Sequence, residues 1–369
     1  MYKFNYWILS CLITLSISAY TSSVSAFAPE GSKENQKAIK HSYFVGMAGV
    51  TSPFLEYHPI LPIEKDDLAK TNYYQVTTGK DGQLLEMRYF ERGMPSNQSY
   101  FGTHKVSYIS NSPNEYERRY FDKENNPASM WRHYYQGGEI HIERYKINEQ
   151  KSQVTLFNIK NEPVESEIGS HLFIAKHLSK RKFVQTQYKL DKSPNKFRNA
   201  MPFMATLINL DERGFLDKVS NIDLPSIIPV ENKDVGYASL KVHFDEYGFE
   251  TGWDYLDANG NLTNDKSESL DIARWSYYRK WTDRKLGKFN YMWVQVYDYT
   301  GTSTQHPNGA ATIRYQKDDL GRFVEAAYLN EKGQLFQPSE VGFAKREFTY
   351  NDDGTRVEIR FDSKGNVIN

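Results

Sequence analysis

Residues 341–369 read VGFAKREFTYNDDGTRVEIRFDSKGNVIN, and two earlier stretches of the chain repeat their pattern. Residues 235–263 read VGYASLKVHFDEYGFETGWDYLDANGNLT, and residues 308–336 read NGAATIRYQKDDLGRFVEAAYLNEKGQLF. In each copy, short runs of alternating apolar and polar residues are separated by an Asp or Asn that has a Gly three positions later. Because this alternation is typical of strands with one buried face, the repeat predicts β-hairpins.

The glycines of the copies recur at a nearly constant spacing. They are twelve residues apart in the sets Gly236, Gly248, Gly260 and Gly309, Gly321, Gly333, and also between Gly342 and Gly354, with Gly365 eleven residues further on. The acidic or amide residues that precede the inner and final glycines are Asp245, Asp257, Asp318, Asn330, Asn351 and Asp362. This pairing predicts type I turns that are closed by a glycine in the left-handed conformation.

The strands of different copies can be placed in a common phase. The apolar residues Val324, Ala326 and Tyr328 take the same offsets as Val357, Ile359 and Phe361, so both sets are predicted to face the core. Weaker copies precede the clear ones, with Asn114 and Asn126 replacing glycine at turns. We count about eight such units from about residue 70 to the end.

These units predict an all-β fold, an antiparallel meander of about eight degenerate strand-turn-strand repeats. Open twisted sheets rarely stay flat beyond about ten strands, so we expect a curled or coiled extended sheet. The repeat domain is assigned to residues 71–369, preceded by an N-terminal cap segment at residues 29–70. The cap segment has Gly and Pro residues but no clear repeat unit.

Residues 1–28 have the features of a signal peptide. A short basic start is followed by a mostly apolar run and then by small residues that suit cleavage. Cys11 is the only cysteine, so the exported chain would have neither disulfides nor thiolate metal sites, unless Cys11 itself anchors a lipid. Export without disulfides favours a bacterial periplasm or cell surface.

The composition gives no sign of a nucleic-acid or membrane partner. Lys plus Arg and Asp plus Glu both number 46, so no net charge attracts the protein to nucleic acid or to anionic lipid. No apolar run after the signal peptide is long enough for a transmembrane segment. Aromatic residues make up 15% of the chain, which favours strands.

The turn sequences YLDANGNLT and RFDSKGNVI resemble the YD repeats of RHS-type proteins, which share an aromatic-Asp-x-x-Gly-Asn pattern. The unit is also similar to MORN-type repeats, another family of short antiparallel hairpins. The resemblance covers most of the chain after the signal peptide. It implies strands wound into a long sheet, often on bacterial surfaces. At this length we expect neither the large size nor the terminal effector domain of the RHS family, and therefore no toxin shell.

No motif in the chain predicts a catalytic site, a cofactor or a metal ion. There is no Gly-x-Ser-x-Gly, no His-Glu-x-x-His and no phosphate-binding glycine loop. The closest histidine pairs are His133 with His141 and His171 with His177, and neither spacing places two imidazoles on one strand face as metal ligands. Each Asx turn offers one carboxylate, too few oxygens for calcium. We therefore expect a protein that is not an enzyme and needs no cofactor.

One aromatic stretch breaks the spacing of the repeats, RWSYYRKWTDRKLGKFNYMWVQVYDYTG at residues 274–301. Met292, Val294 and Val296 are predicted to share one strand face, with aromatic rings on the other. The candidate ligand-binding residues are Trp275, Tyr277, Trp281, Tyr291, Trp293, Tyr297 and Tyr299. Rings spaced along a strand suit sugar rings or an extended peptide, but burial where the sheet folds over itself is the favoured explanation. A weaker cluster comprises Trp131, His133, Tyr134 and Tyr135.

The sequence therefore predicts an exported, non-catalytic repeat protein. It would act as a binding or scaffold module for a protein or glycan partner in the bacterial envelope, in the periplasm or outside the cell. Two alternatives remain open: a hydrolase of envelope polysaccharide or cell wall, with a pair of carboxylates in a cleft, and a periplasmic inhibitor or immunity-type protein.

Overall fold

The structure is a computed structural model, and it describes residues 39–48, 52–55, 57–130, 138–267, 271–351 and 356–368. The predicted signal peptide with Cys11, the cluster around Trp131 and the turn glycine Gly354 lie outside these residues. The chain divides into two compact units. Unit 1 contains the described residues up to Ile227 together with Asp245–Glu250, and unit 2 contains Ile228–Phe244 and the residues from Thr251 onward.

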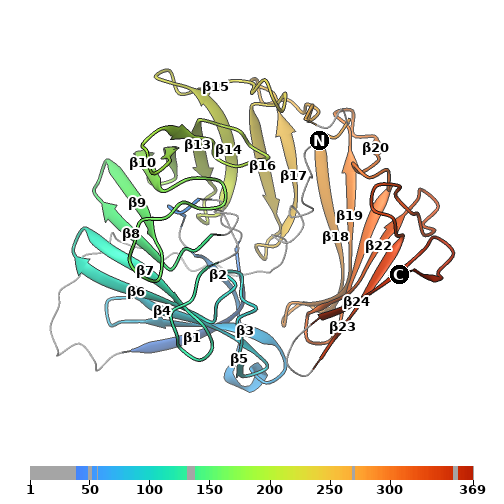
Figure 1. The fold of residues 1–369 in the computed structure, drawn as a ribbon, viewed down its shortest axis with the longest axis horizontal. Helices are drawn as coiled ribbons and strands as arrows, with labels where there is room; N and C mark the ends of the chain where they lie inside the picture. Colours follow the sequence, from blue (N-terminus) through green and yellow to red (C-terminus); the bar gives the residue numbers. More distant parts are fainter. Residues whose placement is uncertain are drawn as a thin grey trace. The chain divides into compact units, whose positions relative to one another are not determined.

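Unit 1 consists of antiparallel strands and one short 3₁₀ helix, Lys65–Asp67 (Figure 1). The long strands pair in the order β2, β1, β3, β4, β6, β7, β8, β9, β10, β11, β13, β14. Their bounds are β1 (Lys40–Met47), β2 (Pro59–Pro62), β3 (Asn72–Thr78), β4 (Leu84–Glu91), β5 (Met94–Pro95), β6 (Lys105–Ser112), β7 (Glu115–Phe121), β8 (Ile142–Ile147), β9 (Lys151–Phe157), β10 (Leu172–Ser179), β11 (Lys182–Tyr188), β12 (Pro194–Asn195), β13 (Ala205–Leu210) and β14 (Leu216–Asp223).

Unit 2 continues the same arrangement (Figure 1). From β17 the long strands pair in the order β17, β18, β19, β21, β22, β23, β24. The bounds are β15 (Ile228–Pro229), β16 (Ser239–Phe244), β17 (Glu250–Leu256, its first residue in unit 1), β18 (Arg274–Asp283), β19 (Lys288–Tyr297), β20 (Ser303–Thr304), β21 (Thr312–Lys317), β22 (Phe323–Leu329), β23 (Lys345–Tyr350), β24 (Arg356–Phe361) and β25 (Val367–Ile368).

The described strands form one antiparallel meander sheet of 25 strands that does not close. This confirms the predicted all-β meander of hairpin pairs. The part of the chain that the structure describes contains no helix with the length and apolar character needed to cross a bilayer.

Two kinds of turn alternate at opposite edges of the sheet. At one edge, tight turns such as Asp211–Phe215 and Asp318–Arg322 join the two strands of a hairpin. At the other edge, a short turn folds the chain back onto the strand it has just left, and a loop then leads to the next strand. In the turn at Asp257, the carboxylate accepts hydrogen bonds from the backbone N–H groups of Asn259 and Asn261 at 2.9 and 2.8 Å. Local bonding of the Asx side chain therefore defines these turns.

The glycines of the repeats hold the backbone conformation that their spacing predicts. Gly248, Gly260, Gly321, Gly333 and Gly365 all have positive φ, between 73° and 89°. In the weaker copies the position shifts by one residue. Asn125 and Asn161 have positive φ, at 67° and 61°, and each lies three residues after the Asx that starts its turn. The assignment of Asn126 as the turn residue was therefore wrong, because the Asx-x-x-Asn turn, and not a strict twelve-residue period, sets the position.

The last hairpin reverses the predicted faces of its second strand. Val357 and Ile359 are 45% and 38% exposed, whereas Ala326 and Tyr328 are 5% and 7% exposed. The prediction that these two sets share the buried face is wrong for β24. The turn at Asp362 follows the turn at Asn351 by eleven residues instead of twelve. A shift of one residue in a strand moves every side chain to the opposite face.

The sheet of unit 1 curls around a segment of its own chain. The Tyr57 hydroxyl lies 3.1 Å from the Tyr120 hydroxyl on β7, while the adjacent His58 packs edge-on against Phe215, next to β14, with ring centroids 5.7 Å apart. Six strand spacings separate β7 from β14, about 29 Å in a flat sheet. Two adjacent residues cannot span that distance, so the strands must curve around them. The curled sheet predicted from the strand number is confirmed within unit 1.

A buried polar network holds this segment in place. Glu143 is fully buried and accepts hydrogen bonds from the hydroxyls of Tyr120 and Tyr145, at 2.8 and 3.2 Å. The guanidinium of Arg118, also buried, lies 3.7 Å from this carboxylate and 4.4 Å from the centre of the Tyr57 ring. Burial and the neighbouring Glu143 raise the pKa of Tyr120, which stays neutral as a donor. The network therefore joins β7 and β8 to the segment that contains Tyr57.

Candidate functional site

The aromatic stretch predicted as a ligand site forms the hairpin of β18 and β19. Its register pairs Tyr278 with Trp293 and Arg274 with Tyr297. Met292, Val294 and Val296 are each fully buried, whereas Tyr291, Trp293 and Tyr297 are only partly buried. The two faces of β19 therefore differ in the way that the alternation predicts. We call the face with Met292, Val294 and Val296 the covered face of unit 2, and the face with Tyr291, Trp293 and Tyr297 its outer face.

The seven predicted ligand-binding residues are divided between these faces. Trp275 and Tyr277 lie on the covered face and are 8% and 4% exposed. Trp281 packs edge-on against Phe289 where the two strands meet their tight turn, with centroids 5.5 Å apart. Tyr299 follows β19 in a short turn and is 60% exposed. Of the seven, the outer face brings together Tyr291, Trp293 and Tyr297.

Two pairs of aromatic rings occupy the outer face. Tyr291 and Trp293 are stacked, with centroids 5.7 Å apart and an interplanar angle of 29°. Tyr278 comes from β18, is 49% exposed, and its hydroxyl lies 3.0 Å from the hydroxyl of Tyr297. The Tyr297 hydroxyl in turn donates to Oε1 of Gln295 at 3.0 Å. Tyr278 is therefore the donor to Tyr297, which makes a row of three polar groups beside the stacked rings.

Tyr297, in the middle of this row, stays neutral at neutral pH. Burial, and then the hydrogen bond with Tyr278, raise the pKa of Tyr297 to about 12. A neutral phenol keeps its proton for the bond to Gln295. The row therefore offers fixed hydrogen-bonding groups without an ionic charge.

Arginine–carboxylate pairs flank the rings and neutralise each other. Arg274 donates two hydrogen bonds to Asp254, at 2.6 and 2.9 Å, and His243 contacts the same carboxylate at 2.9 Å. Burial raises the pKa of Asp254, but the hydrogen bonds from Arg274 and His243 outweigh this effect and hold that pKa at about 2. On the other side, Arg314 donates to one oxygen of Glu325 at 3.0 and 2.7 Å. These two arginine–carboxylate pairs are each neutral, whereas Lys280, opposite Tyr291 in the register, is exposed on the same face.

Sequence reasoning missed Tyr278 and Gln295 as parts of this face. Both were visible in the aromatic stretch, but assigning Tyr278 to the face of Trp293 requires the register of the hairpin. Two register shifts near the tip, between Lys280 and Trp281 and between Trp281 and Asp283, alter that register locally. Alternation within β19 alone does not show which residues of β18 share a face with Trp293.

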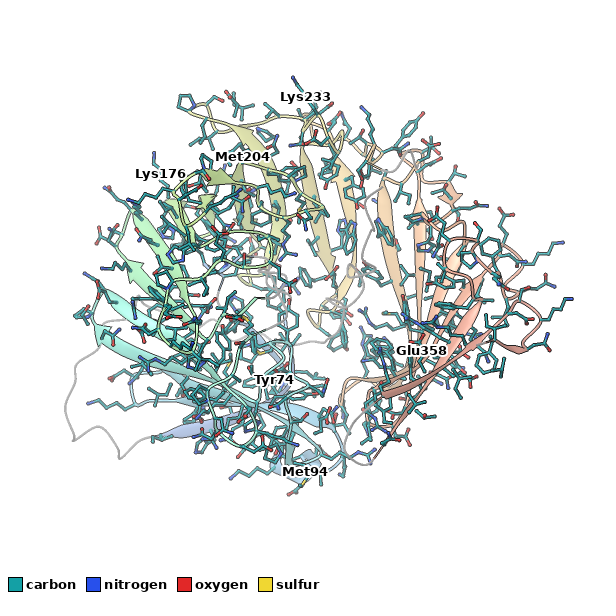
Figure 2. The ribbon with its side chains drawn as sticks, viewed as in Figure 1. Tyr74, Met94, Lys176, Met204, Lys233 and Glu358 are labelled. Carbon is teal, nitrogen blue, oxygen red and sulfur yellow. The ribbon has the colours of Figure 1, made fainter. Side chains whose placement is uncertain are left out.

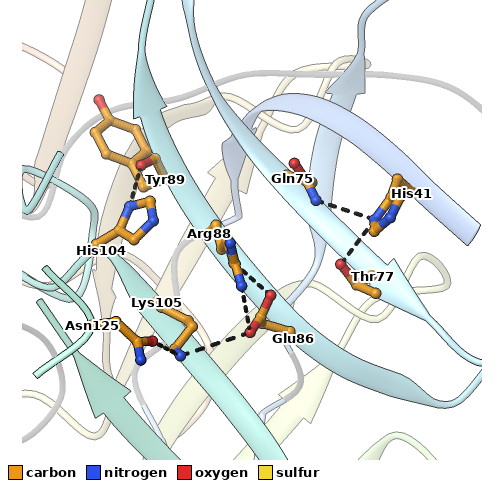
Figure 3. Close-up of polar contacts among 9 residues, drawn as sticks. All are labelled: His41, Gln75, Thr77, Glu86, Arg88, Tyr89, His104, Lys105 and Asn125. Carbon is orange, nitrogen blue, oxygen red and sulfur yellow. Dashed lines mark hydrogen bonds and ion pairs between the residues drawn. The ribbon is translucent and has the colours of Figure 1, made fainter. Parts of the chain in front are cut away.

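Three of the nine histidines form a structural repeat. His104, His141 and His171 each immediately precede the first strand of a hairpin, which is β6, β8 or β10 respectively. Each Nδ1 lies within 2.9 Å of a backbone carbonyl oxygen, which in the case of His104 belongs to Tyr89 (Figure 3). Each ring also packs edge-on against a phenylalanine, Phe90, Phe121 or Phe157. Ala238, Ala273, Ala311 and Ala344 hold the same position in unit 2.

Three charged residues of unit 1, Glu86, Arg88 and Lys105, are also paired. Figure 3 shows Glu86 between Arg88 and Lys105, with Nε of Arg88 at 2.6 Å and Nζ of Lys105 at 4.0 Å. His41 contacts Thr77 and Gln75, each at 3.1 Å. Within the described ranges, no group of three or more His, Cys, Asp or Glu residues could hold a metal ion. The aromatic outer face of unit 2 is therefore the best candidate site.

Comparison with known proteins does not assign a family. Neither the scan against protein-family models nor the search of curated proteins finds a match. The coarser statement holds: the chain is a long antiparallel meander of repeated hairpins.

Proposed function

We propose that this is an exported, non-catalytic binding protein of the bacterial envelope, whose outer face of unit 2 binds a glycan. The observation that carries the proposal is the stacked pair Tyr291 and Trp293 beside the row Tyr278–Tyr297–Gln295. Flat rings bind the apolar faces of sugars, and fixed hydroxyl and amide groups can bind the hydroxyls at the sugar edge. The resemblance of the turns to YD repeats and the predicted signal peptide support an envelope location.

The pairing of the arginines favours a neutral glycan over an acidic one. Arg274 and Arg314 lie on this face and both are bound to carboxylates, and Lys280, opposite Tyr291 in the register, is an exposed cation beside the rings. An acidic polymer would have to displace Asp254 or Glu325 to reach them. Binding of a neutral sugar is expected to change little with salt, because screening affects charged pairs.

Trp293→Ala tests the proposal. We measure binding of the purified protein to an array of neutral and acidic bacterial oligosaccharides, followed by calorimetry on the best ligand. The variant should bind at least about tenfold more weakly, the equivalent of about 1.4 kcal/mol, with the melting temperature nearly unchanged. Tyr299→Ala, an exposed ring outside the outer face, is the matched control and should bind normally.

Two results would contradict the proposal. One is unchanged binding by Trp293→Ala. The other is a loss of stability of about 3–5 kcal/mol in that variant, because this is the cost of removing a buried aromatic side chain. Trp275→Ala, on the covered face, should show that large loss and sets the scale for it.

A further inference from the structure

Lys317 occupies a position of the repeat that is otherwise apolar or aromatic. Where a tight turn starts with Asp or Asn and closes with Gly three positions later, the residue before the turn is Leu210, Phe244, Lys317 or Tyr350. Lys317 is only 8% exposed, whereas the other three are half-buried. A lysine is rarely buried unless it is paired, so the packing of the repeat does not account for this one.

The amine of Lys317 lies between two phenylalanine rings. Its Nζ is 4.5 Å from the centre of the Phe289 ring on β19 and 5.0 Å from the centre of the Phe323 ring on β22. The guanidinium of Arg279 lies over the same Phe289 ring, 5.7 Å from its centre. A ring face attracts a cation, but the loss of water and the nearby guanidinium both disfavour a second positive charge here.

In the part of the chain that the structure describes, no carboxylate is paired with this amine. The adjacent Asp318 is committed to its own turn, where its Oδ2 accepts a hydrogen bond from Nε of Arg322 at 2.9 Å. On the next hairpin, Glu358, which is labelled in Figure 2, is paired with Arg346 and Arg360 at 3.8 and 2.7 Å. The charge of the amine therefore has no direct compensation.

Lys345 and Lys105 also lie over an aromatic ring, but each contacts a carboxylate as well. Nζ of Lys345 is 4.1 Å from the centre of the Phe361 ring and 2.6 Å from Oε1 of Glu347. Nζ of Lys105 is 4.1 Å from a ring centre and 4.0 Å from a carboxylate oxygen. Lys317 has the rings without the carboxylate, so its amine loses its proton most readily where the others are held charged.

This environment changes the chemistry of the amine. Burial, followed by the positive charge of Arg279, lowers the pKa of Lys317 to about 7. Near neutral pH about half of such amines are neutral, compared with about one in 2,500 for an ordinary lysine of pKa about 10.4. A neutral amine has a free electron pair, and desolvation beside another cation is a way in which proteins make lysine a nucleophile.

We propose that the Lys317 side chain is a covalent modification site that forms an imine with small aldehydes. The nitrogen electron pair attacks the carbonyl carbon, the carbonyl oxygen takes up a proton, and the resulting hydroxyl leaves as water when the C=N bond forms. The step needs no oxidant or reductant. Because Lys317 is only 8% exposed, it admits small aldehydes and excludes aldehydes on a polymer. No residue of the proposed glycan site takes part, so the two proposals can fail separately.

The test is reductive methylation of the folded protein with deuterated formaldehyde and cyanoborohydride at about pH 7, followed by peptide mass spectrometry. Cyanoborohydride reduces the imine and so fixes the label on the lysine. A less basic amine is also a weaker nucleophile, as it is among thiols, so the gain is smaller than the ratio of neutral amines. Lys317 should be labelled at least about tenfold faster than Lys345, its matched control within the same molecule.

The pH dependence of labelling provides an independent measurement. Labelling of Lys317 should level off above about pH 8, because its amine is then mostly neutral, whereas labelling of lysines with an ordinary pKa should keep rising. The variant Lys317→Arg keeps a cation at this position and should remove the fast labelling while Lys345 is labelled as before. Thermal melts show that the variant is folded.

Three results would overturn the proposal. The first is labelling of Lys317 that is no faster than labelling of Lys345. The second is labelling of Lys317 only after unfolding in urea, which would show that aldehydes do not reach the amine. The third is fast labelling that persists in Lys317→Arg, because it would then belong to another lysine. Unchanged glycan binding by Lys317→Arg would leave the proposed function unaffected in every case.

Discussion

Gly252 offers a quantitative test of how closely β17 and β18 pack. This residue lies in β17, pairs with Ser276 of β18, and has a φ of 147°, a conformation that favours glycine. A Cβ atom at this position would lie 2.0 Å from the carbonyl oxygen of Trp275 and 3.0 Å from its carbonyl carbon. Close C···O contacts are normally about 3.3 Å or longer, so the Gly252→Ala substitution must move the two backbones apart by about 1 Å.

The expected cost has two parts. The positive φ costs an alanine about 1–3 kcal/mol. Separating the strands weakens the neighbouring backbone hydrogen bonds, each worth about 1 kcal/mol, and leaves buried polar groups unsatisfied. We therefore expect Gly252→Ala to lower the free energy of unfolding by about 4–6 kcal/mol.

Gly260→Ala is the matched control in the turn that follows the same strand. Its φ is 89°, and no atom lies within 4 Å of a Cβ built there, so only the backbone strain remains. Both variants are measured by chemical denaturation, monitored by tryptophan fluorescence, which reports on the adjacent Trp253 and Trp275. Equal losses for the two variants would refute the close approach of β17 to β18.

Three further predictions concern the buried network, a buried lysine and the turns. Tyr120→Phe should destabilise the protein by about 2–3 kcal/mol in thermal melts, because it removes a donor to the buried Glu143 carboxylate; an unchanged melt would contradict the network. Burial, and then Arg279, lower the pKa of Lys317 from 10.5 to about 7. The folded chain then binds fewer protons than the unfolded chain, so stability should rise by up to about 1.4 kcal/mol per pH unit between about pH 7 and 9. Urea titrations should show that Lys317→Met flattens this rise, and an unaltered pH profile would exclude the assignment. Gly321→Val should cost about 1–2 kcal/mol through strain at positive φ, and Gly248→Val should cost more, because a Cβ there would also lie 2.8 Å from the Phe215 ring; unchanged melts for both would reject the turn geometry.

Much of the local structure could be predicted from the sequence. The Asx-x-x-Gly turns were visible at Asp257 and Asp318, because their hydrogen bonds join residues only two to four positions apart. The opposite faces of Val294 and Trp293 also followed from the sequence, because successive side chains of a strand point to opposite faces. Both depend on interactions within a few residues, which the sequence shows directly.

The last hairpin shows how a small local difference escaped that reasoning. The strands β22 and β24 take corresponding positions in their repeats, yet one residue fewer between their turns exposes Val357 and Ile359. The eleven-residue spacing was visible in the sequence. Its consequence depends on pairing with β23, where Glu358 lies opposite the buried Phe348.

The sequence by itself determined the class of fold, the turns and the alternation of faces, because backbone and neighbouring side chains specify them locally. The tertiary structure alone decided what fills the curl of unit 1 and which rings stay in solvent. The contacts of Tyr57 with Tyr120 and of Ser52 with Gln185 join residues 63 and 133 positions apart, and no period in the sequence encodes them. Tyr277 and Tyr278 are adjacent and chemically identical, yet one is buried and the other is half exposed. Burial is a property of the packed whole, so only the folded sheet could distinguish them.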